Sequence, residues 1–286
     1  MPAALPDDLV DAYLRRLGLD REPPSADGLA RIHRAHVERI PWETAWIHEG
    51  RDWGIATTSS AARIATTRRG GYCFHLNGGF AALVAALGYH VTRHVGRVHG
   101  PDGPSADGPI NHLALVVSDL PADDCPEGRW YVDVGLGDGL HSPTPLVVGP
   151  IEQPPFTMVL AAVTPEGVGE WHLAHDPAGS FTGMSFGGPP TGMDVFGERH
   201  TWLTTDPESN FVRYFVVKRR TADTEVALRG LNHSVVAADG TTTTIVDDRS
   251  SWLDLLAEEF GIEPQDPDRL WPRVLRAHQV WTAAQG

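Results

Sequence analysis

The sequence has 286 residues, of which 41% are hydrophobic and 21% are charged, as expected of a globular protein with a sizeable core. Its formal net charge of −14 argues against nucleic acid and anionic membranes as the main partners, because an acidic surface repels both. The N-terminus lacks the pattern of a secretory signal, and the longest apolar run, residues 80–89, is too short to cross a bilayer.

The first third of the sequence predicts helices. Apolar residues recur at helical spacing over residues 9–17, and a second such stretch, 29–40, ends at Pro41. A third predicted helix covers residues 73–87, with an apolar face and a glycine just after its end. We therefore expect the chain to begin with a helical domain.

The sequence then changes to short apolar runs that are divided by Gly, Pro and Asp. These runs predict strands near 91–99, 112–117 and 130–135, joined by turn-forming segments. More strand-like runs follow, namely FTMVLAAV, WHLA, FVRYFVVKRR, EVALRGL and TTTTIV. The chain closes with two predicted helices, roughly 251–260 and 267–282. Helices, then antiparallel strands, then strands with helices make an α+β fold.

Cys73 stands at a position that suits a nucleophile. It follows Gly70 and Gly71, which let the backbone approach a substrate closely, and it opens the third predicted helix. The N-terminus of a helix favours a thiolate over a thiol, and its free N–H groups are able to hold an oxyanion. A lone cysteine at such a place is more often a small buried thiol that packs in the core, so its partners decide the role.

A thiolate nucleophile needs a base, and the base needs an acceptor that orients it. His112 heads an apolar strand, and Asp133 lies inside the next one, where an unpaired carboxylate is costly. If Val117 lies opposite Trp130 in a hairpin, His112 is a diagonal neighbour of Asp133 on the same face. Each residue alone also fits a plain structural role, a solvent-capped histidine or a carboxylate that accepts turn amides. Together with the cysteine they predict a Cys-His-Asp triad.

Three segments around these residues resemble the signature blocks of arylamine N-acetyltransferases. They are RGGYCFHLN around Cys73, NHLALVV around His112 and WYVDVGLG around Asp133. Upstream, residues 34–43 are similar to a family segment that ends in Ile/Val-Pro-Phe-Glu-Asn. Downstream, residues 211–230 resemble a strand pair of the family's third domain, so the resemblance covers most of the chain.

The resemblance implies a fold of three domains around a catalytic core like that of the cysteine proteases. Residues 1–88 would form a helical N-terminal domain that carries the cysteine. Residues 89–200 would form an antiparallel β-barrel domain that carries the histidine and the aspartate. Residues 201–286 would form a C-terminal α/β lid.

The resemblance also implies a ping-pong reaction in which acetyl-CoA, or another acyl-CoA, is a co-substrate and no cofactor is bound permanently. Cys73 would carry the acyl group as a thioester, and an arylamine, an arylhydrazine or a related amine would accept it. By position in the family blocks, His112 would be the base that activates Cys73, and Asp133 would orient the imidazole ring. The implied partners are therefore a small amine and an acyl-CoA.

Three positions depart from the family pattern. His75 stands where Glu is usual, so an ion pair with Arg69 is expected to be lost or replaced. Trp42 and Leu136 stand where Phe is usual, at positions that line the acceptor pocket in the family. Together with Phe74 they are the predicted substrate-binding residues, and their identity leaves the acceptor open.

Other residues give weaker signals. The histidines lack the four-ligand spacing of a structural zinc site, so no metal is predicted. Cys125 lies in an acidic turn that disfavours a thiolate, and we expect it to be inert. With two cysteines there is no disulfide framework, so we expect a cytoplasmic protein. Because basic residues are few, Arg69 and residues 218–220 are the candidates for contacts with nucleotide phosphates.

Three other functions stay open on the sequence alone. An amide synthase would use the same triad to release an acyl chain from an acyl carrier protein in natural-product biosynthesis. A cysteine hydrolase of the protease or transglutaminase type has the same Cys-His-Asp order and would use water or a peptide lysine as acceptor. A binding protein without catalysis would keep only the scaffold. The acyl-chain length and the oligomeric state are not predicted.

Overall fold

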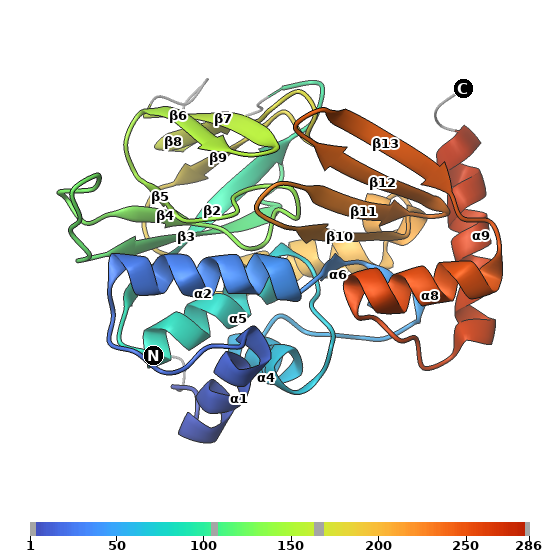
Figure 1. Ribbon diagram of the computed structural model, residues 1–286, viewed down its shortest axis with the longest axis horizontal. Coiled ribbons are helices and arrows are strands. Elements are labelled where there is room, and N and C mark those ends of the chain that lie inside the picture. Colours follow the sequence, from blue (N-terminus) through green and yellow to red (C-terminus); the bar gives the residue numbers. More distant parts are fainter. Residues whose placement is uncertain (1–3, 104–107, 163–168, 284–286) are drawn as a thin grey trace.

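The computed structural model describes residues 4–103, 108–162 and 169–283. Figure 1 shows the N-terminal helices beneath a curled sheet, and a second sheet with the C-terminal helices beside both. This arrangement confirms the predicted α+β fold, with a helical first part, an antiparallel barrel and a C-terminal α/β part.

The N-terminal helices surround one that is buried on nearly every side. In chain order they are α1 (Asp7–Leu17), α2 (Ala26–Arg39), α3 (Ala45–His48), α4 (Thr57–Thr66) and α5 (Cys73–Ala86). The predicted helices correspond to α1, α2 and α5, whereas the apolar pattern predicts neither α3 nor α4. Most of α5 is buried, because apolar residues lie all around it rather than along one stripe. Cys73 is thus the first residue of a helix that the core holds firmly.

Within the described residues, eight strands form one antiparallel sheet in the order β5-β4-β3-β2-β9-β8-β7-β6, which curls into a nearly closed barrel (Figure 1). They are β2 (His90–His99), β3 (His112–Ser118), β4 (Trp130–Val132), β5 (Thr144–Pro145), β6 (Gly149–Gln153), β7 (Phe156–Ala161), β8 (Trp171–Ala174) and β9 (Gly183–Gly187). The predicted pairing of Val117 with Trp130 is confirmed. The strand predicted over 130–135 is too long, since β4 ends at Val132.

Strand β4 ends before Asp133 because the Asp133 side chain forms a hydrogen bond with the backbone two residues later. Its Oδ1 accepts the N–H of Gly135 at 2.9 Å, which makes a turn in place of a further ladder bond. The carboxylate therefore lies at the end of β4 rather than inside it.

The second sheet joins distant parts of the chain. Its order is β1-β10-β11-β12-β13, with β1 (Trp42–Glu43), β10 (Val216–Arg220), β11 (Glu225–Arg229), β12 (Asn232–Ala237) and β13 (Gly240–Ile245). Short helices α6 (Gly197–Thr205) and α7 (Asn210–Arg213) precede β10, after the 3₁₀ turn Asp194–Phe196. The closing helices, α8 (Arg249–Phe260) and α9 (Pro267–Ala283), agree with the predicted ones. Because β1 pairs with β10, the segment before the nucleophile is tied to the C-terminal part.

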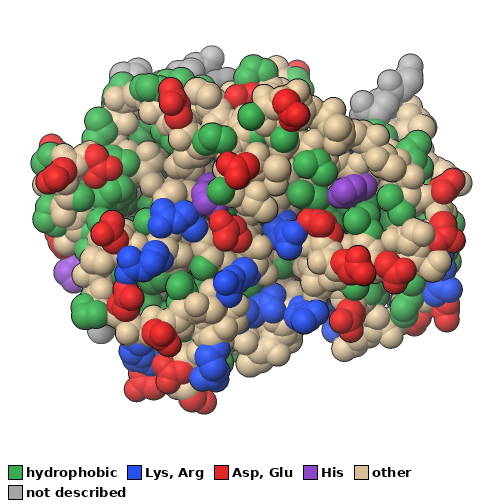
Figure 2. Space-filling view, viewed as in Figure 1, with side chains coloured by type: hydrophobic (Ala, Val, Ile, Leu, Met, Phe, Trp, Pro, Cys, Tyr) green, Lys and Arg blue, Asp and Glu red, His purple; other side chains and the backbone are tan. Residues whose placement is uncertain are grey.

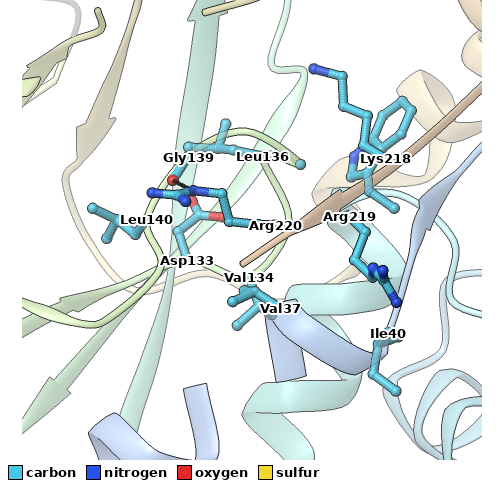
Figure 3. Close-up of a pocket in the computed structure, with 12 residues that line it drawn as sticks. Val37, Ile40, Asp133, Val134, Leu136, Gly139, Leu140, Lys218, Arg219 and Arg220 are labelled. Carbon is cyan, nitrogen blue, oxygen red and sulfur yellow. Dashed lines mark hydrogen bonds between the residues drawn. The ribbon is translucent and has the colours of Figure 1, made fainter. Parts of the chain in front are cut away.

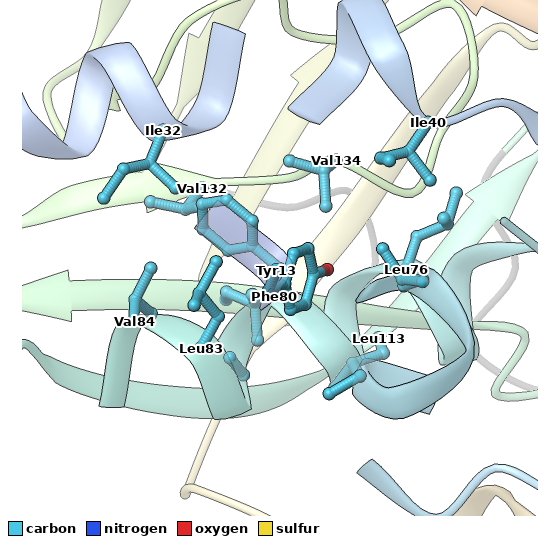
Figure 4. Close-up of a cluster of buried hydrophobic side chains, with 14 of the residues drawn as sticks. Tyr13, Ile32, Ile40, Leu76, Phe80, Leu83, Val84, Leu113, Val132 and Val134 are labelled. Carbon is cyan, nitrogen blue, oxygen red and sulfur yellow. The ribbon is translucent and has the colours of Figure 1, made fainter. Parts of the chain in front are cut away.

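Strand β3 is buried on both faces, which explains its unbroken apolar sequence. One face packs with α1, α2 and α5 in the cluster drawn in Figure 4, where Leu113 lies near Phe80 and Leu76. The other face contributes Ala114 and Val116 to the interior of the barrel. A separate apolar cluster, which includes Phe215 and Trp252, fills the space between the second sheet and helices α8 and α9.

On the face drawn in Figure 2, basic side chains gather in the centre and lower part and acidic ones stand between them. This face therefore offers no uninterrupted basic surface. None of the helices in the described ranges combines the length and the apolar character that a membrane crossing needs.

Candidate active site

The nucleophile loop is held by two glycines that no other residue could replace. A Cβ atom at Gly70 would lie 1.9 Å from the backbone oxygen of Pro41. Gly71 has a φ of +130°, and a Cβ there would lie 2.7 Å from the ring of His75. The glycines therefore let the loop pack closely against the protein itself, and they place Cys73 at the start of α5.

His112 and Asp133 form a short hydrogen bond in the interior. Nε2 of His112 lies 2.6 Å from Oδ2 of Asp133, and both side chains are almost fully buried. The side chain of Cys73 adjoins the ring closely enough for the two charges to interact, and its sulfur donates to the backbone oxygen of Asn111 at 3.6 Å. The structure thus brings the three predicted catalytic residues together.

Burial and neighbouring charges shift the pKa values of His112 and Asp133. Burial alone would lower the pKa of His112, but the charges of Asp133 and Cys73 outweigh it and raise the pKa to about 10. Burial likewise opposes ionisation of Asp133, yet the charge of His112 and hydrogen bonds from His112, Asn77 and Gly135 lower the pKa of Asp133 below its ordinary value. The arrangement favours an imidazolium that is hydrogen-bonded to a carboxylate and lies next to Cys73.

Two further side chains hold Asp133, and the sequence reasoning missed both. The Tyr131 hydroxyl donates to Oδ2 at 2.8 Å, and the Asn77 amide donates to Oδ1 at 2.9 Å. Asn77 also accepts the N–H of Val134, so one side chain fixes both the carboxylate and its backbone. The sequence separation of each residue from Cys73 or Asp133 could have identified it. Asn77 stands four residues after Cys73 on one helix face, and Tyr131 stands two residues before Asp133.

Comparisons with known proteins agree with this geometry. The N-acetyltransferase family model matches residues 25–268. The arylamine N-acetyltransferase of Mycolicibacterium smegmatis is 32% identical over 271 residues, which cover 89% of this chain and 92% of the relative. The chain belongs to the arylamine N-acetyltransferase family. It is therefore an acetyltransferase, as the sequence blocks predicted.

Solved structures of the family share the fold. That of the M. smegmatis arylamine N-acetyltransferase has a TM-score of 0.80 at 30% identity and covers 93% of this chain and 97% of its own. That of the Mycobacterium marinum enzyme in complex with CoA has a TM-score of 0.80 at 26% identity, covering 93% of this chain and 98% of its own.

Arg69 forms its ion pairs with residues other than the one at position 75. Arg69 donates to both carboxylate oxygens of Glu43, at 2.9 and 2.6 Å, and to Glu49 at 2.8 Å. Glu43 also accepts the N–H of Gly70, so the pair fixes the backbone just before the nucleophile. His75 needs no charged partner, because burial holds its pKa well below the ordinary value and keeps the ring neutral.

A cavity of about 430 Å³ opens beside Cys73, His112 and the acceptor-pocket positions of the family. Trp42 and Leu136 line it. The ring of Phe74 is fully buried and packs on Phe196 with ring centroids 4.9 Å apart, so a contact between Phe74 and substrate stays a prediction. The sequence reasoning missed the other aromatic residues that line the cavity, which come from the loop before β9 and from the segment of α6 and α7: Phe181, Trp202, Phe211 and Tyr214.

The basic residues considered for nucleotide phosphates are bound to the protein itself. Figure 3 shows residues 218–220 of β10 beside the loop that follows β4, where Arg220 reaches the backbone of Gly139. The other partners are Asp138, Glu225 and Ser180 for Lys218, Glu259 for Arg219, and Gln153 for Arg220. Lys218 and Arg220 therefore fasten the loop to the second sheet, whereas Arg219 binds helix α8. The described residues contain no group of His, Cys, Asp or Glu side chains placed to hold a metal ion.

Cys125 has a structural environment. It is buried, it carries a free thiol, and its sulfur donates to the backbone oxygen of Arg129 at 3.2 Å within a turn. It lies away from the residues that line the cavity.

Proposed function

We propose that this protein transfers an acetyl group from acetyl-CoA to an arylamine, an arylhydrazine or a related amine, through a thioester on Cys73. The observation that carries the proposal is the buried hydrogen bond between His112 and Asp133, with Cys73 beside the imidazole ring at the edge of the cavity. Relatives that are named arylamine N-acetyltransferases, one of them solved with CoA, support the choice of donor and acceptor.

In the first half of the reaction the thiolate of Cys73 attacks the carbonyl carbon of the acetyl thioester. The backbone N–H groups of Cys73 and Phe74 have no acceptor within α5, since they belong to its first turn, and they are suited to hold the oxyanion. The bond to the CoA sulfur then breaks, and the imidazolium of His112 supplies the proton that CoA takes away.

In the second half the amine attacks the thioester on Cys73, and His112 accepts the proton that the amine loses. The thiolate leaves, so the enzyme returns to its starting state. Asp133 acts through His112 in both halves, because its Oδ2 holds Nε2 of the ring and leaves Nδ1 for the proton transfer.

We also propose the domain boundaries 1–88, 89–200 and 201–286, which fit separate apolar clusters in the barrel and in the C-terminal part. The boundary between residues 200 and 201 falls inside helix α6. This helix begins at Gly197 and packs mainly on the apolar cluster of the N-terminal helices. A cytoplasmic location is proposed from the two free thiols, which suit a reducing compartment. The acyl carrier protein of an amide synthase has no support in the relatives.

Incubation with acetyl-CoA, without an acceptor, tests the function. We expect mass spectrometry to find one acetyl group on the peptide that contains Cys73 and none on the peptide that contains Cys125. A Cys73→Ala variant should remain unmodified, and a Cys125→Ser variant should react like the unaltered protein. An unmodified Cys73, with no turnover of any arylamine or hydrazine, would refute the proposal. Slow hydrolysis of the thioester and fast transfer to amines would separate the transferase from a hydrolase.

A further inference from the structure

A buried histidine of α2 lies behind the catalytic aspartate. His33 is fully buried among the apolar residues of this helix, where a polar ring is costly unless it finds hydrogen-bond partners. Its Nε2 lies 3.1 Å from the backbone oxygen of Asp133 and 3.4 Å from the backbone nitrogen. Its Nδ1 lies 3.0 Å from the backbone oxygen of His141. One ring thus contacts both ends of the loop 133–141, which also carries the cavity residue Leu136.

The two ends of this loop depend on His33 to different degrees. The other end is also held elsewhere, since the His141 ring binds Glu38 at 2.7 Å and the His141 N–H donates to Gln153. Asp133 lies just beyond the paired residues of β4, and its backbone N–H and C=O both face the His33 ring. Loss of the ring should therefore release the Asp133 end and leave the His141 end in place.

The contacts also indicate which nitrogen of His33 carries the hydrogen. Burial lowers the pKa of His33 to about 4, so the ring is neutral near pH 7 and has a single N–H. With the hydrogen on Nδ1, the ring donates to His141 and Nε2 accepts the N–H of Asp133. With the hydrogen on Nε2, the ring donates to the Asp133 oxygen alone, and the lone pair of Nδ1 faces the His141 oxygen. The first tautomer makes two hydrogen bonds and the second makes one, so we expect the first.

The main chain of Asp133 determines where its carboxylate lies. A single carbon separates the backbone of an aspartate from its carboxyl group, so the carboxylate moves whenever the main chain moves. Its Oδ2 lies 2.6 Å from Nε2 of His112, and a hydrogen bond this short weakens steeply when it is misaligned. Asn77 fixes the next backbone N–H, that of Val134, which leaves the backbone of Asp133 itself to His33.

We propose that His33 is a positioning residue for the reaction, which holds the main chain of Asp133 from α2 and so keeps the carboxylate in line with His112. The proposal rests on the function proposed above. It adds a residue that does not line the active-site cavity and acts only through the backbone of the aspartate.

Two substitutions separate the roles of the ring nitrogens. Asparagine reaches only the position of Nδ1, so His33→Asn loses the contact with Asp133. Glutamine reaches the position of Nε2, and in His33→Gln its amide oxygen accepts the N–H of Asp133. The matched control is His36→Asn. His36 lies one turn later on the same helix, is equally buried and packs on the same Phe80 ring, but its Nε2 binds the hydroxyl of Tyr13.

The pKa of His112, followed by NMR titration without substrate, reports its pairing with Asp133. In His33→Asn we expect this pKa to fall by about 1 or more, because the contact with the carboxylate weakens roughly tenfold. Acetylation of Cys73, measured as the nitrophenol burst from 4-nitrophenyl acetate, should slow about tenfold to a hundredfold. His33→Gln should recover most of both values. His36→Asn should retain both, although urea unfolding should show a loss of stability similar to that of His33→Asn.

The proposal is overturned if His33→Asn leaves both the pKa of His112 and the burst unchanged. It is also overturned if His36→Asn lowers both as much, since the effect would then be one of general packing. Should His33→Asn fail to fold, the ¹⁵N resonances of the His33 ring in the unaltered protein decide. A hydrogen on Nδ1 alone supports the contacts described above, and a hydrogen on Nε2 at pH 7 overturns the proposal.

The titration needs no turnover, which separates this proposal from the proposed function. A protein in which the pKa of His112 depends on His33, but in which Cys73 is never acetylated, would refute the function and retain the link between His33 and Asp133. A protein that acetylates Cys73, and in which the pKa of His112 does not depend on His33, would do the opposite.

Discussion

Replacing Asp133 by Asn changes one atom of the triad and tests its electrostatics directly. The carboxylate receives four donors, His112 and Tyr131 on Oδ2 and Asn77 and Gly135 on Oδ1. An amide presents a donor in place of one oxygen, so in either orientation two hydrogen bonds are replaced by facing donors. The negative charge that raises the pKa of His112 is lost at the same time.

The size of the effect follows from the protonation of His112. With a pKa of about 10, roughly 99% of His112 is an imidazolium at pH 8, whereas at its ordinary pKa only about 3% would be. That is about a thirtyfold loss of the catalytic form, and burial without a carboxylate makes it larger. The variant also loses the hydrogen bond that orients the His112 ring, which reduces the rate further. We therefore expect acetylation of Cys73 to slow by about 10³ to 10⁴.

Stability should change with a defined dependence on pH. His112 has a folded pKa above its unfolded value of about 6.5, so the stability it supplies is complete below pH 6.5 and disappears as the pH rises to about 10. Asp133→Asn lacks this contribution. We therefore expect the variant to be less stable by about 3 to 5 kcal/mol near pH 6, and the difference to shrink as the pH rises toward 10.

Two assays measure these effects. The rate of the nitrophenol burst from 4-nitrophenyl acetate reports acetylation, and urea unfolding from pH 5 to 10 reports stability. Asp119→Asn is the matched control, because Asp119 also pairs with a histidine, His90, but at an exposed site. That variant should change stability by less than about 1 kcal/mol and leave the burst unchanged. An Asp133→Asn burst within tenfold of the unaltered rate, with stability that does not depend on pH, would refute the electrostatic role given to Asp133.

Three smaller perturbations test the surroundings of the triad. Tyr131→Phe removes one donor to the carboxylate and should slow the burst about three- to tenfold. Glu43→Gln breaks the buried ion pair behind the nucleophile loop and should destabilise the fold by about 3 to 5 kcal/mol in urea, whereas the exposed Glu263→Gln should change it by less than about 1 kcal/mol. Lys218→Met removes the cation that, against burial, lowers the pKa of Asp138 to about 2. Its loss of stability should be full near pH 7 and decrease as the pH falls from about 4 to 2.

Local patterns predicted that His112 and Asp133 would lie together, while the roles given to them with Cys73 stay predictions. The apolar run of β3 and the register of Val117 with Trp130 are properties of one hairpin, and they put His112 and Asp133 on the same side of the sheet. The helix of Cys73 was predicted from one apolar face and the glycine after its end, whereas in the structure its apolar residues extend over all its faces. The family blocks then supplied the barrel and the lid, which spacing alone does not distinguish from other antiparallel folds.

The rest depends on contacts between distant segments. Helix α4 is rich in Thr and Ser, so its helical signal is weak and its packing against α1 and α5 determines it. Strand β1 has two residues and exists because Trp42 pairs with Lys218. The partners of the basic residues on β10 also come from distant segments of the chain. The charge of these basic residues suggested phosphate binding, but buried carboxylates and backbone oxygens that the chain brings from elsewhere already engage them.

The side of the cavity that carries the reacting residues is packed differently from the side that would contact the acceptor. His112 begins β3, whose two faces belong to two different apolar clusters, so any shift of the base would disturb both. The opposite wall comes from short helices α6 and α7, where Arg199 is fastened by one stacking contact and Phe211 is only partly buried. Phe211 nevertheless packs on the rings of Trp42 and the buried Tyr72, so a substitution there would reach the residue next to Cys73. The acceptor is therefore freer to vary through Arg199, whose substitution leaves the Cys73–His112–Asp133 geometry untouched, than through Phe211.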